Sequence, residues 1–485
     1  MRNQRLAIIF FQPAKLVFSI FSFFFLTHCF PELKKSPQDQ LMDIRVMLCI
    51  ANQISCGSTS FSYPGSPFSL RTKESVSLTP TITIKQDNPN FTIKPDLPKG
   101  LSIQATTGEI SGIPKEIIPL TDFKVSLSSA SGNAETTLQI KIDVPNPCAD
   151  STISTGSGTI GDPYIICNPS QLQSIATFHI THINSNYKII QDLDLSSISN
   201  FTPIGDLSTP FTGTIDGQGY TLFNLTMNHP GIQRIGLIGT STSTVQARNI
   251  NLVKPNVRGD SYVGVLGGHM QGYFENIHIT QGTVYSNISY AGGVLGRISG
   301  STSYIYDSSF EGTVQTPGDF AGGILGENFG GDRIVRSFVK ATVSGNNYSG
   351  GLTGRSASST TENCYFIGTV QGADYVGGLT GRSQLSADIV INSYAVAPVT
   401  ATGTNKSGLV GAATSTQTNA YYNIDVAGQS DNDTRGIPRT TTQLQCPTVS
   451  SDGCAGVPMY AAWDDAVWDF GTSTQYPKLK WENSQ

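Results

Sequence analysis

The chain has 485 residues, of which only 13% are charged, 38% are hydrophobic and 50 are glycine. This composition favours turn-rich β structure, and its apolar content excludes wholesale disorder. Residues 1–28 carry three positive charges and no acid, so without them the formal net charge changes from −5 to −8. A surface of that sign does not attract nucleic acid or anionic lipid, which excludes both as electrostatic partners.

Residues 1–28 predict a signal peptide. Arg2 and Arg5 form a short basic head, and residues 16–26 (LVFSIFSFFFL) form an apolar run of 11 residues. A run of this length is typical of a signal peptide and is too short to span a bilayer. An uncleaved anchor is the alternative, but Lys15 in the longer apolar stretch would be costly in lipid.

The signal ends in Leu26-Thr-His-Cys29, which resembles the lipobox of bacterial lipoproteins. The resemblance implies that Cys29 is diacylated and that residues 29–60 form a lipidated tether, with acyl chains contributing about 0.8 kcal/mol per buried CH₂. His28 departs from the small residues that the box favours, so an incidental Cys after an ordinary signal is the alternative. We expect a bacterial outer-membrane lipoprotein exposed at the cell surface.

The eight cysteines suggest a partly oxidised framework. Three pairs lie close in sequence and are candidate disulfides in an oxidising compartment: Cys49 with Cys56, Cys148 with Cys167, and Cys446 with Cys454. Cys364 is left over. Because no C-x-x-C motif occurs, zinc ribbons and thioredoxin-type redox sites are disfavoured.

Residues 61–146 predict a small β-sandwich. Short runs with period-two apolarity, such as residues 137–144, are bounded by Pro, Gly, Asn and Asp. Residues 97–103 (LPKGLSI) and 107–114 (TGEISGIP) resemble the Ig-like, cadherin-like family of bacterial surface proteins. The resemblance implies a spacer module. A calcium-binding role is the weaker alternative because the acidic residues are scattered.

Residues 147–485 repeat with a period near 28. Clusters of Gly and aliphatic residues end in glycines that are 28, 29, 30, 28, 27 and 30 residues apart. Two further positions keep the same period. One is a valine at the end of a short predicted strand, and the other is a residue, usually polar, at the start of another predicted strand. The valines are Val257, Val284, Val314, Val343, Val370, Val399 and Val426; the polar residues are Asn249, Asn276, Asp307, Arg336, Asn363, Asn392 and Asn419.

This periodicity predicts a parallel β-solenoid, or β-helix. Coils stacked at about 4.8 Å would pair every strand with the coils above and below and form ladders of like residues. A β-propeller is the alternative, but its blades are usually longer. Cys364 shares a repeat position with Ser308, Ser337, Ser393 and Ala420. We therefore expect a buried inert thiol there and not a nucleophile.

Several motifs in this region resemble the GLUG-motif family of bacterial surface proteins. They are residues 161–176 (GDPYIICNPSQLQSIA), 192–195 (DLDL), 201–205 (FTPIG), 211–220 (FTGTIDGQGY), 467–471 (VWDFG) and 476–481 (YPKLKW). The resemblance covers about two-thirds of the chain. We expect a capping helix over Ser170–Phe178 with Ser170 as its N-cap. We also expect Trp463, Trp468 and Trp481 to cover the last coil, whose open edge would invite aggregation.

The resemblance raises an enzyme hypothesis, because some IgA-cleaving zinc metallopeptidases carry GLUG repeats. That chemistry needs H-E-x-x-H, which does not occur among the six histidines; His179 and His182 are the nearest pair. Polysaccharide cleavage would need carboxylates in one groove, and the candidates sit at turns where structural roles are favoured: Asp192, Asp194, Asp206 and Asp216. We therefore predict no enzymatic activity, catalytic residue, metal or cofactor.

Binding is the remaining function, because a solenoid offers long and stiff faces. Tyrosine supplies contact area at low entropic cost, although it is also common on solvated β surfaces. The candidate ligand-binding residues are Tyr262, Tyr290, Tyr348, Tyr365, Tyr375, Tyr394 and Tyr421. We expect an all-β adhesin for a glycan or a host or matrix protein. A structural envelope protein without a ligand and a glycan-active β-helix enzyme are the alternatives.

Overall fold

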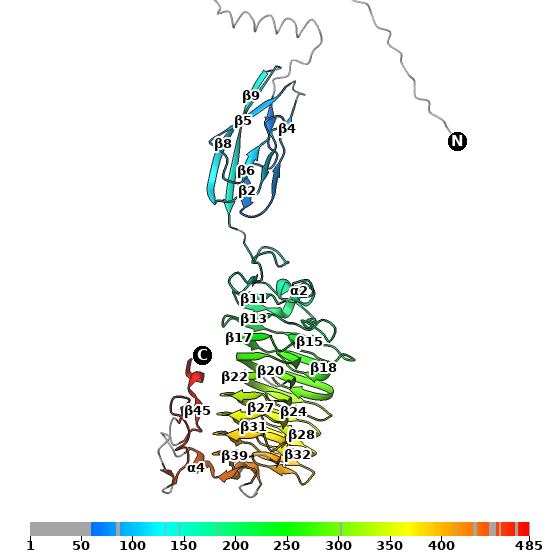
Figure 1. Ribbon diagram of the computed structural model, residues 1–485, viewed down its shortest axis with the longest axis vertical. Helices are drawn as coiled ribbons and strands as arrows, with labels where there is room; N and C mark the ends of the chain where they lie inside the picture. Colours follow the sequence, from blue (N-terminus) through cyan, green and yellow to red (C-terminus); the bar gives the residue numbers. More distant parts are fainter. Residues whose placement is uncertain are drawn as a thin grey trace, which may run out of the picture. The chain divides into compact units, whose positions relative to one another are not determined.

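The computed structural model describes residues 60–83, 88–130, 132–144, 146–182, 184–300, 303–414, 416–429, 434–445, 453–454, 457–470 and 474–484. The predicted signal peptide and almost all of the tether lie outside these residues, as do Cys29, Cys49, Cys56 and Cys446. The chain divides between residues 145 and 146 into two compact units (Figure 1). Strands account for 51% and helices for 7% of the structure, which confirms the all-β prediction.

The first unit is an Ig-like β-sandwich. Its strands are β1 (Phe61–Ser62), β2 (Phe68–Arg71), β3 (Val76–Leu78), β4 (Thr81–Ile82), β5 (Asn90–Lys94), β6 (Leu101–Ile103), β7 (Ile110–Gly112), β8 (Ile118–Ser129) and β9 (Gly132–Asp143). One sheet has the order β2-β9-β8-β5 and another β3-β7-β6, with β1 paired to β4. Alternate residues of the long strands β8 and β9 point inward, so that Phe123, Val125 and Ile140 are almost fully buried.

The second unit is a parallel β-solenoid of about eight turns, as predicted. Its upstream elements are β10 (Tyr164–Ile166), α2 (Pro169–Phe178), β11 (Asn186–Ile189), β12 (Leu193–Asp194), η2 (Leu195–Ser197), β13 (Thr214–Asp216), β14 (Thr221–Phe223), β15 (Thr226–Asn228), β16 (Ile238–Thr240), β17 (Gln246–Val253), β18 (Asn256–Val263), β19 (Gly267–Met270), β20 (Tyr273–Gly292) and β21 (Leu295–Ser299).

Four regular coils follow. Their strands are β22 (Tyr304–Tyr306), β23 (Ser309–Gln315), β24 (Ala321–Gly322), β25 (Leu325–Phe329), β26 (Arg333–Val335), β27 (Phe338–Ser344), β28 (Asn347–Gly350), β29 (Thr353–Ala357), β30 (Thr360–Glu362), β31 (Tyr365–Gly372), β32 (Asp374–Gly377), β33 (Thr380–Ser383), β34 (Ile389–Ile391), β35 (Tyr394–Val396), β36 (Val399–Ala401), β37 (Lys406–Ser407) and β38 (Val410–Ala413). The sheet β16-β19-β21-β25-β29-β33-β38 forms one side of the stack.

The last elements are β39 (Thr416–Thr418), β40 (Tyr421–Asn423), α3 (Ile424–Ala427), β41 (Ile437–Arg439), α4 (Thr441–Gln445), β42 (Gly453–Cys454), β43 (Val457–Pro458), β44 (Trp468–Asp469), β45 (Lys478–Leu479) and η3 (Lys480–Ser484). The predicted valine ladder is real from Val257 to Val399, where each valine pairs with the next and is buried. Val426 is the exception: it lies in helix α3 and does not close a strand.

The polar position of each repeat is a tight corner, which lies within β17 and β20 in the first two repeats and between two strands in the others. All seven residues predicted there, from Asn249 to Asn419, have positive φ angles between 46° and 54°. One residue further on, the hydroxyls of Ser308, Ser337 and Ser393 accept a hydrogen bond from the N–H of the preceding coil. Each also donates to the carbonyl two residues upstream. The small-residue slot thus satisfies backbone groups that strand pairing leaves open at the corner.

The helix at the start of the solenoid differs in detail from the prediction. Helix α2 begins at Pro169, and Asn168, not Ser170, is its N-cap: its side-chain oxygen accepts from the N–H of Gln171 at 2.9 Å. Asparagine caps as well as serine does, and proline suits the first helical turn, so the cap moves two residues upstream. A disulfide between Cys148 and Cys167, with Cα atoms 5.3 Å apart, ties the start of the unit to this region.

The predicted cover of the last coil is present only in part: Trp463 stacks on Tyr421 and donates to the carbonyl of Asn419, whereas Trp468 and Trp481 contact coils further upstream. The three tryptophans belong to a C-terminal strap, defined here as residues 457–470 and 474–484, which runs back along one side of the stack (Figure 1). Its Trp463 and Trp468 are buried against Tyr365, Tyr394 and Tyr421 of three successive coils, and Trp481 packs on Phe338 of the coil before them. A row of large apolar side chains on the outside of a sheet needs cover, and the strap supplies that cover along the side of the stack.

Candidate functional site

The structure separates the seven predicted ligand-binding tyrosines into two ladders. Tyr365, Tyr394 and Tyr421 lie one above another on β31, β35 and β40, with exposed fractions of 1%, 0% and 4%. The Tyr365 hydroxyl donates to Glu482 at 2.8 Å, and the other two hydroxyls donate to backbone carbonyls of the strap. The prediction of ligand binding is therefore wrong for these three, because the strap already occupies them.

The other four tyrosines form an aromatic stack that solvent reaches. Tyr262, Tyr290, Tyr348 and Tyr375 are half-buried, and Phe320 completes the series. Successive ring centroids are 4.5, 4.5, 4.9 and 4.9 Å apart, with interplanar angles between 5° and 23°. The prediction missed Phe320 because it considered only tyrosine. The signal was present in the sequence, since each of the five aromatic residues lies two positions before a glycine of the Gly-aliphatic cluster.

These five aromatic residues all adopt the left-handed backbone conformation, with φ between 54° and 68°. This conformation is unusual for a bulky side chain and costs of order 1–3 kcal/mol per residue. Stacking offsets part of that cost, at about 0.5–1.5 kcal/mol for each aromatic pair. The backbone turn directs every ring to the same side of the solenoid, so the stack is a continuous feature of its surface.

A row of arginines runs beside the stack. Arg297, Arg355 and Arg382 occupy one position of successive strands in the seven-stranded sheet, with Glu327 paired between the first two. The guanidinium carbon of Arg355 lies 4.5 Å from the ring centroid of Phe320, and that of Arg382 lies 4.9 Å from Tyr375. Arg297 lies 5.8 Å from Tyr290. Such cation–π contacts fix the orientation of the guanidinium groups.

We call these eight residues the arginine–aromatic stripe: Tyr262, Tyr290, Phe320, Tyr348, Tyr375, Arg297, Arg355 and Arg382. Its charge is positive despite the acidic chain. Glu327 is fully buried and lies against both Arg297 and Arg355. Arg382 has no ion pair with any acidic residue in the part of the chain that the structure describes. Burial lowers the pKa of Arg355, but a guanidinium stays charged throughout the physiological range.

The four carboxylates considered for glycan cleavage hold local structure together. Asp206 accepts from the N–H groups of Ser208 and Thr209, and Asp194 accepts from Asn224 and from the N–H of Ser196. Asp192 accepts from the N–H of Thr221 at 2.8 Å.

Asp216 is the most buried of the four. Burial raises its pKa, but hydrogen bonds from Asn249, Gln218 and Arg248 outweigh that effect and lower it. Hydrogen bonds also lower the pKa of Asp194 and Asp206. A general acid needs the opposite shift, toward a higher pKa.

The histidine pair and the free thiol have structural surroundings. His182 stacks on Phe178 at 3.7 Å, and burial lowers the pKa of His179. Among the described residues, no group of three His, Cys, Asp or Glu is placed to hold a metal ion. Cys364 is fully buried; burial raises its pKa to about 12, and its thiol donates to the carbonyl of Glu362. That environment is the inert one predicted from the repeat.

Known proteins match parts of this chain. Residues 52–145 match the family described as "Putative Ig domain". Halomucin of Haloquadratum walsbyi is 32% identical over 157 residues, which are 30% of this chain and 2% of halomucin. A "Putative Gly-rich membrane protein" of Evansella cellulosilytica is 27% identical over 143 residues, 28% of this chain and 16% of that protein. The chain thus spans less than a fifth of either relative.

A solved structure is also similar. It is described as the crystal structure of a putative immunoglobulin A1 protease from Bacteroides ovatus, with a TM-score of 0.46 and 19% sequence identity over 68% of this chain and 95% of that one. Among the helices that the structure of this chain describes, none combines the length and apolar character required to cross a bilayer.

Proposed function

We propose that this protein is a non-enzymatic surface protein of the bacterial envelope whose solenoid binds an acidic polysaccharide through the arginine–aromatic stripe. The observation that carries the proposal is the row formed by Arg297, Arg355 and Arg382, held against stacked rings on a surface that solvent reaches. A guanidinium group presents donors in a planar fork that matches carboxylate and sulfate groups.

The linear arrangement of the stripe favours a polymer as the ligand. Adjacent coils are about 4.8 Å apart, and Arg297, Arg355 and Arg382 lie on one line along the sheet, with the coil of Glu327 between the first two. A polysaccharide with regularly placed acidic groups can follow such a line, whereas a folded protein presents its acids irregularly. Because the rings hold the guanidinium groups in place, little conformational entropy is lost when they bind.

The backbone of the stripe supports a functional role. Five bulky residues in the left-handed conformation carry a cost that smaller side chains or glycine would avoid. Strained backbone of this kind clusters at binding and catalytic sites. In contrast, the other left-handed corner of these coils carries a polar residue, which is Asn249, Asn276, Asp307, Arg336 or Asn363.

The envelope location is part of the proposal. The signal peptide and lipobox predicted from residues 1–29, the resemblance to GLUG-motif surface proteins, and a relative named as a membrane protein support it. Replacing Cys29→Ala should leave the protein unprocessed or release it in soluble form. Unchanged partitioning into the membrane fraction would contradict lipidation.

Binding can be tested with the chain that begins after Cys29, immobilised on a biosensor. The probes are polygalacturonate, alginate, polysialic acid and chondroitin sulfate, with dextran as the uncharged control. We expect saturable binding of at least one acidic polymer, weakened by salt. Failure of all four would favour the structural envelope role, and release of new reducing ends would favour the glycan-active enzyme.

A further inference from the structure

A hollow on the outward face of the upstream coils differs from the stripe, because its lining carries no charged side chain. It has a volume of about 800 Å³ and is bordered by Thr221, Asn249, Asn251, Asn276, His278 and Trp481, among others. Most of these residues come from β14, β17 and β20, and Trp481 comes from the strap. We call this hollow the amide groove. Its volume lies in the range of ordinary small-molecule sites.

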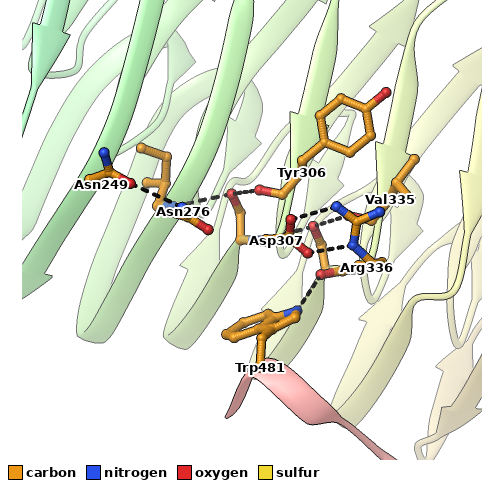
Figure 2. Close-up of polar contacts among 10 residues, drawn as sticks. Asn249, Asn276, Tyr306, Asp307, Val335, Arg336 and Trp481 are labelled. Carbon is orange, nitrogen blue, oxygen red and sulfur yellow. Dashed lines mark hydrogen bonds and ion pairs between the residues drawn. The ribbon is translucent and has the colours of Figure 1, made fainter. Parts of the chain in front are cut away.

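The strap makes one wall of the groove. His278, Ser309 and Phe338 occupy one ladder position on three successive coils. The Trp481 ring lies 4.9 Å from the ring of His278 and 5.4 Å from that of Phe338, so it fills the space above the small Ser309. Its indole N–H donates to the carbonyl of Arg336 at 2.9 Å (Figure 2). Trp481 is thereby fixed as a wall.

The floor of the groove offers fixed amide groups. The Asn276 amide donates to the side-chain oxygen of Asn249 at 3.0 Å, and both residues sit at left-handed corners (Figure 2). The Asn251 amide donates to the carbonyl of Gly219 at 2.7 Å, which orients its own oxygen. An amide carries donors and acceptors side by side, as sugar hydroxyls require.

The lining of the groove is uncharged. It contains no Asp, Glu, Lys or Arg side chain. His278 is also neutral near pH 7, since burial lowers its pKa to about 4, and its Nδ1 lies 3.1 Å from the Ser309 hydroxyl. An acidic polymer would therefore find no counter-charge here, which distinguishes this groove from the stripe.

We propose that the amide groove binds a neutral oligosaccharide, with Asn249, Asn251 and Asn276 hydrogen-bonding to its hydroxyl groups and Trp481 packing against one end. The ligand is recognised by hydrogen bonds and contact area, and charge plays no part. This site is independent of the stripe, so either one can bind when the other does not.

The test uses the chain that begins after Cys29 and a panel of maltohexaose, cellohexaose, xylohexaose, mannohexaose and chitohexaose, with affinities from titration calorimetry. We expect one of them to bind with an affinity that does not change between 50 mM and 500 mM NaCl. Thr280 lines the groove, so Thr280→Arg should fill it and weaken binding at least tenfold. Thr342→Arg adds the same side chain at an exposed position of β27 and should leave binding unchanged.

A second and more conservative variant keeps the test valid if Thr280→Arg fails to fold. Trp481→Phe keeps a ring between His278 and Phe338 but shortens the wall, and should weaken binding by a smaller factor, about threefold to fivefold. Absence of binding to all five probes overturns the proposal. The proposal is also overturned if an oligosaccharide binds the Thr280→Arg variant as tightly as it binds the unmodified chain.

Discussion

Glu327 is fully buried and lies against Arg297 on one neighbouring coil and Arg355 on the other. The ladders of a solenoid place like residues above one another, and here the central coil supplies the carboxylate that two arginines share. The shared carboxylate lies between Arg297 and Arg355 and offsets their repulsion, whereas Arg355 and Arg382 are direct neighbours in the sheet.

Replacing Glu327→Gln should destabilise the solenoid by about 2–4 kcal/mol, because two partly buried guanidinium groups lose their shared counter-charge. The value is below that of a fully buried pair, since the two arginine side chains remain 23% and 20% exposed. Urea unfolding measures the loss. Glu311→Gln is the control, since its contact with Lys340 is exposed and should contribute less than about 1 kcal/mol. Equal losses would contradict the account.

Replacing Cys364→Ser should leave stability within about 1 kcal/mol, because serine occupies the same slot in three other coils and makes the same hydrogen bonds. Cys364→Val should cost about 1–3 kcal/mol, since a buried N–H and a carbonyl lose their partner. In the native protein the thiol should resist iodoacetamide until urea unfolds the chain. Peptide mass spectrometry measures the modification of Cys364 separately from that of the other cysteines. Rapid modification of Cys364 in the folded protein would contradict a buried thiol.

Replacing Trp468→Ala should loosen the strap. The side chain is 1% exposed and its indole N–H donates to Asn363 at 3.1 Å, so truncation should cost about 3–5 kcal/mol locally. Hydrogen exchange should accelerate in β31, β35 and β40, which the strap covers. The strands β8 and β9 of the other unit are an internal control and should not change. Unaltered protection of β35 would show that the strap contributes little.

Acidification should weaken the solenoid between pH 6.5 and 4. Burial lowers the pKa of His269 and His278 to about 4, below the unfolded value near 6.5, so the stability they contribute is lost as pH falls through this window. Asp332 acts oppositely, because burial raises its pKa to about 6. Burial also lowers the pKa of His179, so three histidines oppose one carboxyl group and the net effect of acidification is a loss of stability.

Thermal melts at several pH values test this balance. The double variant His269→Asn, His278→Asn should flatten the dependence, and Asp332→Asn should steepen it. The carboxylates with lowered pKa values, such as Asp194 and Asp260, stabilise the fold at neutral pH, and this contribution is lost only below about pH 4, as the pH falls below their unfolded values. A melting temperature that stays constant from pH 7 to 4 would contradict the assignment.

The repeat made the solenoid predictable, because a strict period determines which residues pair. Val314, Val343 and Val370 stack as the spacing implies, and Cys364 lies in its predicted slot. An added Cβ at Gly351 would lie 2.3 Å from the ring of Phe366, which explains why the cluster keeps its glycine pair.

The environment of each tyrosine was not predictable from the repeat. Tyr348 and Tyr365 lie in neighbouring coils and both belong to repeated elements, yet one is half-buried and the other is covered. The difference arises from the strap, whose Glu482 meets Tyr365 across 117 residues. A period describes contacts between neighbouring coils and carries no information about a segment that folds back over several of them.

The central claim is that guanidinium groups of the stripe bind an acidic polymer, and it is tested most directly by comparing two arginine variants. Arg382→Gln removes a charge of the stripe. Arg258→Gln is matched to it, because Arg258 also lies over a ring, at 4.8 Å from Tyr285, but outside the stripe.

The measurement is the affinity of each variant for the acidic polysaccharide that binds best, at low salt. The account predicts at least a fivefold loss for Arg382→Gln and no change for Arg258→Gln. Equal affinities for both variants and the unmodified chain would contradict it.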